Sequence, residues 1–163
     1  MEKEIEVLVE VCREDVVLPE YANFGDAGMD LRSAVDIDIL PGETAVVPTG
    51  LKVAIPIGYE IQVRPRSGIS LKTPLRVVNS PGTIDSGYRD EVGVIINNSS
   101  KEGNEVYSIS EKGNKHGIYR IKKGDRIAQI VLKEVPIIKW KTVADIKQDG
   151  INRGGGFGSS GTK

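Results

Sequence analysis

Two acidic residues flank a glycine in the segment Asp26 to Leu31 (DAGMDL). Acids in this pattern commonly cap backbone N–H groups in a loop, and a functional role is the alternative. A second segment, Arg64 to Ser70 (RPRSGIS), combines arginines with a Ser-Gly pair at the start of a predicted helical turn. A serine hydroxyl, backbone N–H groups and an arginine there can bind a phosphate. A helix N-cap beside solvated arginines would explain the same residues.

A third segment carries a carboxylate among apolar residues. The stretch Gly82 to Gly93 (GTIDSGYRDEVG) is typical of a hairpin, with Ile84 and Val92 as apolar anchors on its two arms. Asp85 follows the first anchor, and an oriented carboxylate in such surroundings can act as a general base. An aspartate in an ordinary turn is the structural alternative. Tyr88 suits either packing within the hairpin or contact with a flat ligand.

A fourth segment, Gly124 to Leu132 (GDRIAQIVL), places Arg126 and Gln129 in an otherwise apolar strand. A glutamine in such a strand needs hydrogen-bond partners, which a ligand, a water molecule or a core group would supply. The tail from Gly150 to Lys163 holds six of the 19 glycines and is typical of a disordered terminus. An arginine and a phenylalanine within the tail favour a function instead.

Other kinds of site are excluded or disfavoured by what the chain lacks. The GxxxxGK[ST] phosphate loop of ATPases is absent, and no His/Cys cluster could bind a transition metal. The single cysteine, Cys12, rules out an intramolecular disulfide. The single histidine, His116, lies in a polar stretch that favours a solvated side chain.

The composition of the chain bounds its class. Its 163 residues are the size of one domain, and 39% hydrophobic with 28% charged residues is typical of a globular protein. A net charge of -1 argues against a broad basic field that binds nucleic acid. The first residues lack the apolar stretch of a signal peptide, and no apolar run approaches the roughly 20 residues that span a bilayer. We therefore expect a cytoplasmic protein without nucleic-acid or membrane partners.

The elements that must position these residues are mostly short strands. Apolar residues alternate with polar ones in Ile5 to Val9, Val35 to Ile39 and Tyr59 to Val63, and β-branched runs occur further on. Gly/Pro turn signals separate the runs, so a sandwich, jelly roll or barrel is predicted, with one helical turn at Gly68 to Thr73. The polar stretch Asn97 to Lys115 is predicted to be a long hairpin excursion.

The order and spacing of the segments resemble a known family. DAGMDL, RPRSG, GTIDSGY, GDRIAQ and RGGGFGSSG are similar to the five motifs of the homotrimeric dUTP pyrophosphatases (dUTPases), from about Gly25 to Gly161. The resemblance implies an all-β, single-domain jelly roll (a dUTPase-like β-clip) over residues 1–149 and a flexible glycine-rich lid over residues 150–163. It also implies a homotrimer with three active sites at the subunit interfaces.

The same resemblance implies the activity and the residues that carry it. The reaction is the hydrolysis of dUTP to dUMP and pyrophosphate, which limits uracil in DNA and supplies dUMP for dTTP synthesis. Asp85 matches the base that activates the attacking water, and Gln129 matches a contact to that water and the phosphates. The residues matched to uracil and deoxyribose are Asn79, Thr83, Ile84, Tyr88, Gly93 and, stacking from the tail, Phe157. Those matched to the phosphates are Arg66, Ser67, Gly68, Arg126, Arg153, Gly158 and Ser159.

A magnesium ion, held mainly by the substrate phosphates, is also implied, with Asp30 in contact through water. Two departures from the family pattern are visible. The tail has one residue fewer between Arg153 and Phe157, and Asp90 stands where many members have glycine. Two alternatives stay open. One is a dCTP deaminase or bifunctional deaminase-dUTPase. The other, motivated by the excursion at Asn97 to Lys115, is a binding protein, either a catalytically idle jelly roll or a phage-type dUTPase with an added regulatory partner.

Overall fold

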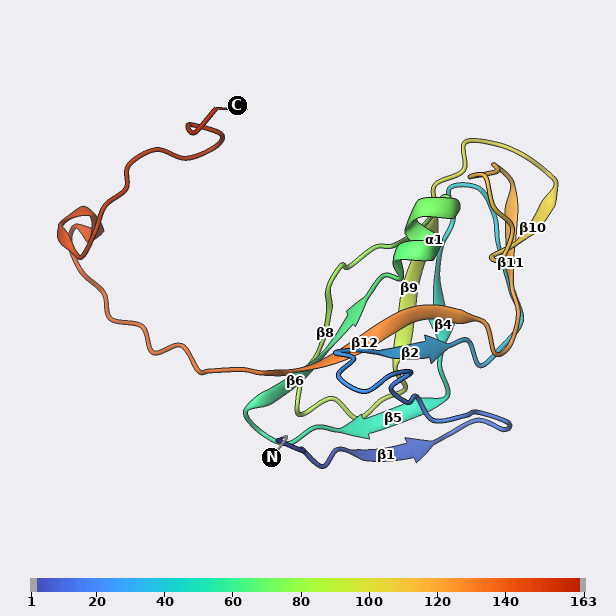
Figure 1. The fold of residues 1–163 in the computed structure, drawn as a ribbon, viewed down its shortest axis with the longest axis horizontal. Coiled ribbons are helices and arrows are strands. Elements are labelled where there is room, and N and C mark those ends of the chain that lie inside the picture. Colours follow the sequence, from blue (N-terminus) through green and yellow to red (C-terminus); the bar gives the residue numbers. More distant parts are fainter. Residues whose placement is uncertain (1–2, 162–163) are drawn as a thin grey trace.

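A computed structural model describes residues 3–161 of the chain, and its regular elements are almost all β-strands (Figure 1). The elements, in chain order, are β1 (Leu8–Val11), β2 (Met29–Arg32), β3 (Ile37–Ile39), β4 (Thr44–Pro48), β5 (Leu51–Ala54), β6 (Tyr59–Arg64), α1 (Ser67–Lys72), β7 (Leu75–Val77), β8 (Gly82–Ile84), β9 (Gly93–Asn98), β10 (Val106–Ser108), β11 (Ile118–Ile121), β12 (Arg126–Glu134) and the 3-10 helix η1 (Ile146–Gln148). The predicted all-β class is confirmed, and the arrangement fits a jelly-roll-like β-clip.

Four small sheets make up the body. The largest has the strand order β2-β12-β6-β8, and two three-stranded sheets have the orders β4-β9-β7 and β10-β11-β3. The fourth is the ribbon β1-β5, which lies beside the larger sheets in Figure 1. All strand pairs are antiparallel except β10 with β11. Strands distant in the sequence therefore come together, as β2 and β12 do.

Isoleucine, valine and leucine build the core between these sheets, as the scarcity of aromatic residues predicts. Most members come from the inward faces of strands, and Ile61 and Val63 show the alternation seen in the sequence. Tyr119 is the exception, because its ring is fully buried among the aliphatic side chains. Its hydroxyl donates to the Lys115 carbonyl at 2.9 Å, which satisfies the polar end of the side chain.

The predicted hairpin excursion at Asn97 to Lys115 is wrong. β10 pairs in parallel with β11, which a hairpin cannot produce, and β9 pairs with β4 and β7 instead of β11. The buried Asn98 amide donates to the Ile39 and Gly117 carbonyls at 2.8 Å each. These two bonds anchor the base of the excursion, so it folds back onto the body at the edge of the β10-β11-β3 sheet.

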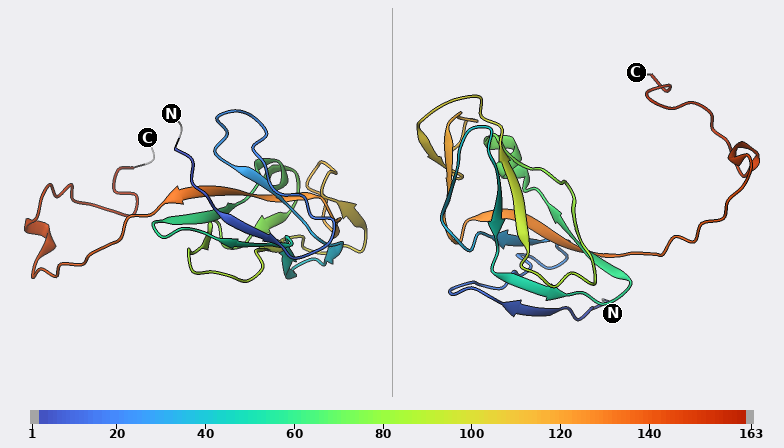
Figure 2. Two further views of the ribbon diagram at one scale, coloured as in Figure 1. Left: turned by 90° about the horizontal axis from the view of Figure 1, so that it is seen from below. Right: turned by 180° about the vertical axis from the view of Figure 1, so that it is seen from behind.

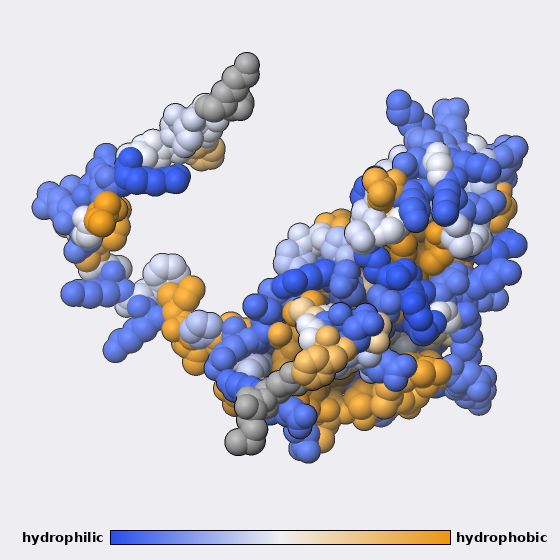
Figure 3. All heavy atoms as spheres, viewed as in Figure 1, coloured by the Kyte–Doolittle hydropathy of each residue, from blue (hydrophilic) through white to orange (hydrophobic). Residues whose placement is uncertain are grey.

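The chain leaves the body after β12. The amide of Val135 still donates to the Gly58 carbonyl at 2.8 Å, and the following residues extend away from the sheets (Figures 1 and 2). Apolar side chains along this segment are exposed, including Trp140 at 84% and Phe157 at 115%, and apolar atoms are visible there in Figure 3. Within residues 3–161, no helix has the length and apolar character needed to cross a membrane.

Candidate active site

Four of the five motifs have residues on or next to the largest sheet, and three of them meet around Gln129. Antiparallel pairing places Gln129 of β12 opposite Asp30 of β2 on one side and opposite Arg64 of β6 on the other. The register of β12 against β2 shifts between Arg126 and Ala128, and such a bulge redirects the side chains beside it. The sequence segments are far apart, so only this pairing brings their polar groups together.

Asp30 lies between two arginines from different motifs. The Nε of Arg66 is 2.9 Å from its Oδ1, and the Nε of Arg126 is 3.6 Å from its Oδ2. Arg66 also donates from Nη1 to the backbone carbonyl of Arg126 at 3.2 Å. All three side chains are partly exposed, between 31% and 51%. The carboxylate therefore holds two cations at the surface, where an anion can reach them.

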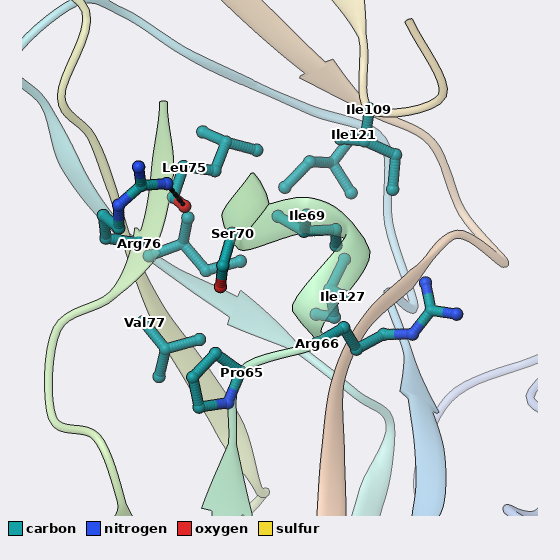
Figure 4. A pocket seen from close by; sticks show the side chains of 11 residues that line it. Pro65, Arg66, Ile69, Ser70, Leu75, Arg76, Val77, Ile109, Ile121 and Ile127 are labelled. Atoms are coloured by element: carbon teal, nitrogen blue, oxygen red, sulfur yellow. Dashed lines mark hydrogen bonds between the residues drawn. The ribbon is translucent and has the colours of Figure 1, made fainter. Parts of the chain in front are cut away.

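The turn into α1 carries the Ser-Gly pair of the second motif. Arg66 occupies the N-cap position and makes no side-chain capping bond, while Ser67 and Gly68 are exposed at the start of the helix. Figure 4 shows the Arg66 side chain directed away from the apolar pocket under α1, which is lined by residues such as Ile69 and Ile127. The alternative of a helix cap with solvated arginines is thus wrong, because Arg66 is bound to Asp30 and Ser67 is not the cap.

Gln129 obtains its hydrogen bond from the protein backbone. Its Nε2 donates to the Pro65 carbonyl at 3.1 Å, so a core group supplies the partner that the sequence left open. Gly28 faces the same amide. A Cβ at this position would lie 3.0 Å from Gln129 Oε1 and 3.2 Å from the Ile130 carbonyl oxygen. The glycine of the first motif therefore makes room for the glutamine of the fourth.

A pocket of about 180 Å³ opens beside the fourth strand of this sheet. Its lining contains every residue of the body that the sequence assigns to uracil or deoxyribose: Asn79, Thr83, Ile84, Tyr88 and Gly93. The remaining lining residues are Val63, Gly82, Val92 and Ile95, which the sequence analysis did not assign. The sequence signal that could have identified Val63 and Ile95 is strand alternation. It places each of them on the opposite face of its strand from its immediate chain neighbours.

The predicted hairpin around this pocket is wrong in one respect. Its two arms, β8 and β9, belong to different sheets, although both apolar anchors, Ile84 and Val92, are buried as expected. β8 pairs with β6 and is the edge strand of its sheet. The arms therefore stand apart, and the space between them is the pocket instead of a hydrogen-bonded ladder.

Asp85 and Tyr88 lie in the turn between the arms. The carboxylate of Asp85 is exposed and directly follows Ile84, which lines the pocket. The amide of Tyr88 donates to the Asp85 carbonyl at 3.1 Å, which closes the turn. The Tyr88 hydroxyl donates to the Glu91 carbonyl at 2.9 Å, and its side chain is 40% exposed. The ring thus forms one wall of the pocket with its hydroxyl already bound.

Glu91 is a residue of this region that the sequence analysis missed. Its side chain accepts from Arg13 Nε at 2.6 Å and Nη2 at 2.9 Å, and from the Gly50 amide at 2.8 Å. The guanidinium of Arg13 holds the pKa of Glu91 below its ordinary value, and the Gly50 hydrogen bond acts in the same direction. Arg13 precedes Glu91 by 78 positions, so no local sequence signal joins the two.

The tail residues are not brought to this site in the structure. Arg153, Phe157, Gly158 and Ser159 all lie exposed in the extended segment beyond β12. Gly154 and Gly155, with φ of 62° and 72°, let the backbone turn where other residues would be strained. The predicted contacts of these tail residues with uracil and the phosphates stay predictions. So does the boundary between the jelly-roll domain (residues 1–149) and the lid (residues 150–163).

No group of three or more His, Cys, Asp or Glu side chains within residues 3–161 is arranged to hold a metal ion. Asp30, the predicted metal contact, is bonded to the two arginines described above. The donors present therefore do not form a protein cage for a divalent cation. They fit an ion that takes most of its ligands from a bound triphosphate and water, because magnesium accepts such oxygen ligands and retains waters.

Comparison with known proteins gives consistent matches. The dUTPase family model matches residues 14–161. A deoxyuridine 5'-triphosphate nucleotidohydrolase of Desulfotalea psychrophila is 43% identical over 166 residues, covering 99% of each chain. A Staphylococcus bacteriophage 80alpha dUTPase, solved with dUpNHpp, has a TM-score of 0.82 at 32% identity and covers 96% of this chain and 99% of that one. A mutant dUTPase of phage phi11 of S. aureus, with a coordinated structural Mg(II) ion, has a TM-score of 0.79 at 32% identity over 88% and 99%.

Proposed function

Because the chain belongs to the dUTPase family and hydrolyses dUTP to dUMP, we propose that Asp85 activates the attacking water. The observation that carries this assignment is the pocket whose wall ends at Asp85 and contains all five body residues matched to the nucleoside. In the proposed step, the water oxygen forms a bond to the α-phosphorus as its proton passes to the carboxylate. The bond from the α-phosphorus to the bridging oxygen breaks, and pyrophosphate leaves.

Uracil binds, in this proposal, between the two arms of the pocket. β8 is an edge strand, so its outward backbone groups have no strand partner within the described sheets. Fixed backbone donors and acceptors can pair with the uracil carbonyls and ring N–H, and the amino group of cytosine would leave such groups unpaired. The pocket, at about 180 Å³, is smaller than the roughly 300–1,000 Å³ typical of sites for drug-sized ligands. A single pyrimidine ring is a suitable occupant.

The deoxyribose packs on the Tyr88 ring, and the Asn79 side chain supports the uracil site through water. A ribose 2′-hydroxyl would collide with the tyrosine, so the enzyme would select deoxynucleotides by shape. The fixed hydroxyl of Tyr88, bonded to the Glu91 carbonyl, supports this role because it restrains the ring. The hydrogen bond also means that the hydroxyl need not be satisfied by substrate.

The triphosphate binds to the cationic surface around Asp30. Arg66 and Arg126 are the charged groups there, with Ser67 and Gly68 at the adjacent helix start and Gln129 on β12. Asp30 keeps both guanidinium groups in place without substrate, so little reorganisation is needed when the phosphates arrive. Mg2+, held mainly by the phosphates and touching Asp30 through water, would neutralise charge on the phosphate oxygens.

The finer organisation of the enzyme is proposed from the same resemblance. Three chains form a homotrimer with active sites at the interfaces, in the cytoplasm. The tail over residues 150–163 closes over bound nucleotide, with Phe157 stacked on uracil and Arg153, Gly158 and Ser159 at the phosphates. Exposed apolar side chains along the tail, such as Ile151 and Phe157, support docking onto another surface. Closure would exclude water from the reacting phosphate.

The test is pyrophosphate release from dUTP, dCTP, dTTP and UTP, each with and without Mg2+. We expect turnover of dUTP alone, and stronger turnover with the metal. Ammonia release from dCTP would instead support the deaminase alternative, which the matched relatives do not favour. An Asp85→Asn variant should bind dUTP and lose turnover by about 10²- to 10⁴-fold, because the lost general base supplies a factor of that size. Retained turnover would refute the assignment of the base.

A further inference from the structure

The arm that carries Tyr88 is fastened to a part of the chain outside the five motifs. The β1-β5 ribbon pairs Val11 with Leu51, and the Cys12 amide donates to the Gly50 carbonyl at 2.8 Å. This pairing holds Arg13 and the turn at residues 49–51 close together. At Gly50, with φ of 74°, a Cβ would lie 2.5 Å from Val16 Cγ2 and 3.2 Å from Arg13 Cβ. The two segments are therefore packed as tightly as the backbone allows.

The ribbon and its adjacent turn at residues 49–51 form hydrogen bonds to the arm at Glu91 and Val92. Besides the three bonds to the Glu91 carboxylate, the Val92 carbonyl accepts from Thr49 N at 3.1 Å and from Thr49 Oγ1 at 2.6 Å. The Val92 amide donates to the Leu51 carbonyl at 2.8 Å. Thr49 and Val92 are 2% and 4% exposed, so these bonds are shielded from water. The backbone of the arm is thus fixed at its base, immediately beside the pocket.

The carbonyl of Glu91 is also the acceptor for the Tyr88 hydroxyl. Glu91 therefore connects the ribbon to the tyrosine: its side chain binds Arg13 and Gly50, and its backbone carbonyl binds the Tyr88 hydroxyl. A shift of Glu91 moves the acceptor that fixes the ring. To reject UTP for its one additional hydroxyl, the Tyr88 ring must stay in place. A mobile ring would move aside and relieve the collision with the 2′-hydroxyl.

We propose that the Arg13–Glu91 pair is a positioning device that holds Tyr88 in place and sets the discrimination between dUTP and UTP. The proposal rests on the function proposed above for Tyr88 as the deoxyribose wall. Neither Arg13 nor Glu91 needs to touch the nucleotide. Both act through Tyr88, and their loss should relax selectivity more than it slows hydrolysis of dUTP.

The chain offers a matched control for this pair. Arg120 binds Asp38 in the same two-bond geometry, with Nε and Nη2 each 2.7 Å from a carboxylate oxygen. That pair joins β11 to β3, in a sheet that contributes no residue to the nucleotide pocket. Asp38→Asn therefore removes an equivalent surface ion pair at a place where the wall is not affected.

The experiment measures kcat/KM for dUTP and for UTP on the same preparation of each variant, and compares their ratio. Unfolded enzyme cancels from this ratio, so a loss of stability alone does not change it. We expect Arg13→Met and Glu91→Gln to lower the dUTP:UTP ratio by about tenfold, as a wall displaced by a fraction of an ångström would. Arg13→Lys should give an intermediate ratio, because lysine keeps the charge and loses the paired geometry. Asp38→Asn should leave the ratio unchanged.

A Tyr88→Ala variant distinguishes this proposal from the underlying one, that Tyr88 forms the wall against the deoxyribose. If Tyr88→Ala lowers the ratio and both Arg13→Met and Glu91→Gln leave it unchanged, the positioning proposal is overturned and the role of Tyr88 stands. If Tyr88→Ala leaves the ratio unchanged, the deoxyribose wall itself is wrong and the positioning proposal falls with it. A ratio lowered equally by Asp38→Asn would show that the effect is not specific to this arm.

Discussion

Gly93 offers a test of how closely the uracil pocket depends on backbone position. It lines the pocket, and a Cβ at Gly93 would lie 2.5 Å from Val46 Cγ1, on the neighbouring strand β4. Apart from Gly93 and its chain neighbour Val92, no residue of the pocket lining has an atom within 4 Å of that Cβ. A Gly93→Ala methyl group would therefore leave the pocket empty and act only by pushing β9 and Val46 apart.

The size of the effect follows from the crowding. Ordinary van der Waals contact begins at 3.4 Å, so the 2.5 Å contact is short by about 0.9 Å. Val46 is β-branched and cannot easily rotate away on a strand, so we assume that it and the β9 backbone share the displacement. A shift of about half an ångström, at roughly 10²-fold per ångström, predicts about a tenfold loss in kcat/KM for dUTP. Overpacking should also cost about 1–3 kcal/mol of unfolding free energy.

The assay is steady-state pyrophosphate release, with thermal unfolding measured in parallel. The matched control is Val46→Ala, whose side chain is 62% exposed, so that substitution alone should change little. In the double variant the added methyl group has room, and kcat/KM should return close to that of the unmodified enzyme. The reasoning is refuted if the double variant stays as slow as Gly93→Ala, or if Gly93→Ala alone is fully active.

Three further outcomes are expected. Asp85→Asn should keep its affinity for dUTP in calorimetry and lose turnover, and weak binding with normal turnover would contradict its role. Removing residues 150–163 should lower kcat strongly and leave the melting temperature of the body unchanged, because the described part of that segment, residues 150–161, extends away from the sheets; unchanged kinetics would make it a linker. The Arg120 guanidinium lowers the pKa of Asp38 in the folded protein. The Asp38 carboxylate therefore takes up a proton more readily in the unfolded chain than in the folded one. The stability that Asp38→Asn removes at pH 7 should shrink as pH falls below about 4, and a difference independent of pH would contradict this ion pair.

Local patterns in the sequence predict a large part of the body. The alternation in Tyr59 to Val63 corresponds to β6, and the short helix and the buried anchors Ile84 and Val92 lie where expected. These features depend on neighbouring residues, whose periodicity determines which side chains face the core. The motifs likewise identify the lining of the pocket, because their order along the chain is visible without any knowledge of pairing.

Features that depend on distant partners could not be predicted in this way. The parallel pairing of β10 with β11 contradicts the hairpin that a polar insertion suggests. The Arg13–Glu91 pair and the contact between Gly93 and Val46 depend on how separate strands are stacked. The separation of the β8 and β9 arms has the same cause, since β8 pairs with β6 and β9 pairs with β4 and β7.

The exposed segment between β12 and the tail gives the protein an intrinsic fluorescent probe. Trp140 is the only tryptophan of the chain, and it lies 84% exposed in the segment that follows β12. Indole emission shifts to shorter wavelength when the ring leaves water, so the fluorescence of the unlabelled enzyme reports where this segment lies. Rapid mixing with nucleotide would then time any docking of the segment against the release of pyrophosphate, without introducing a dye or a substitution.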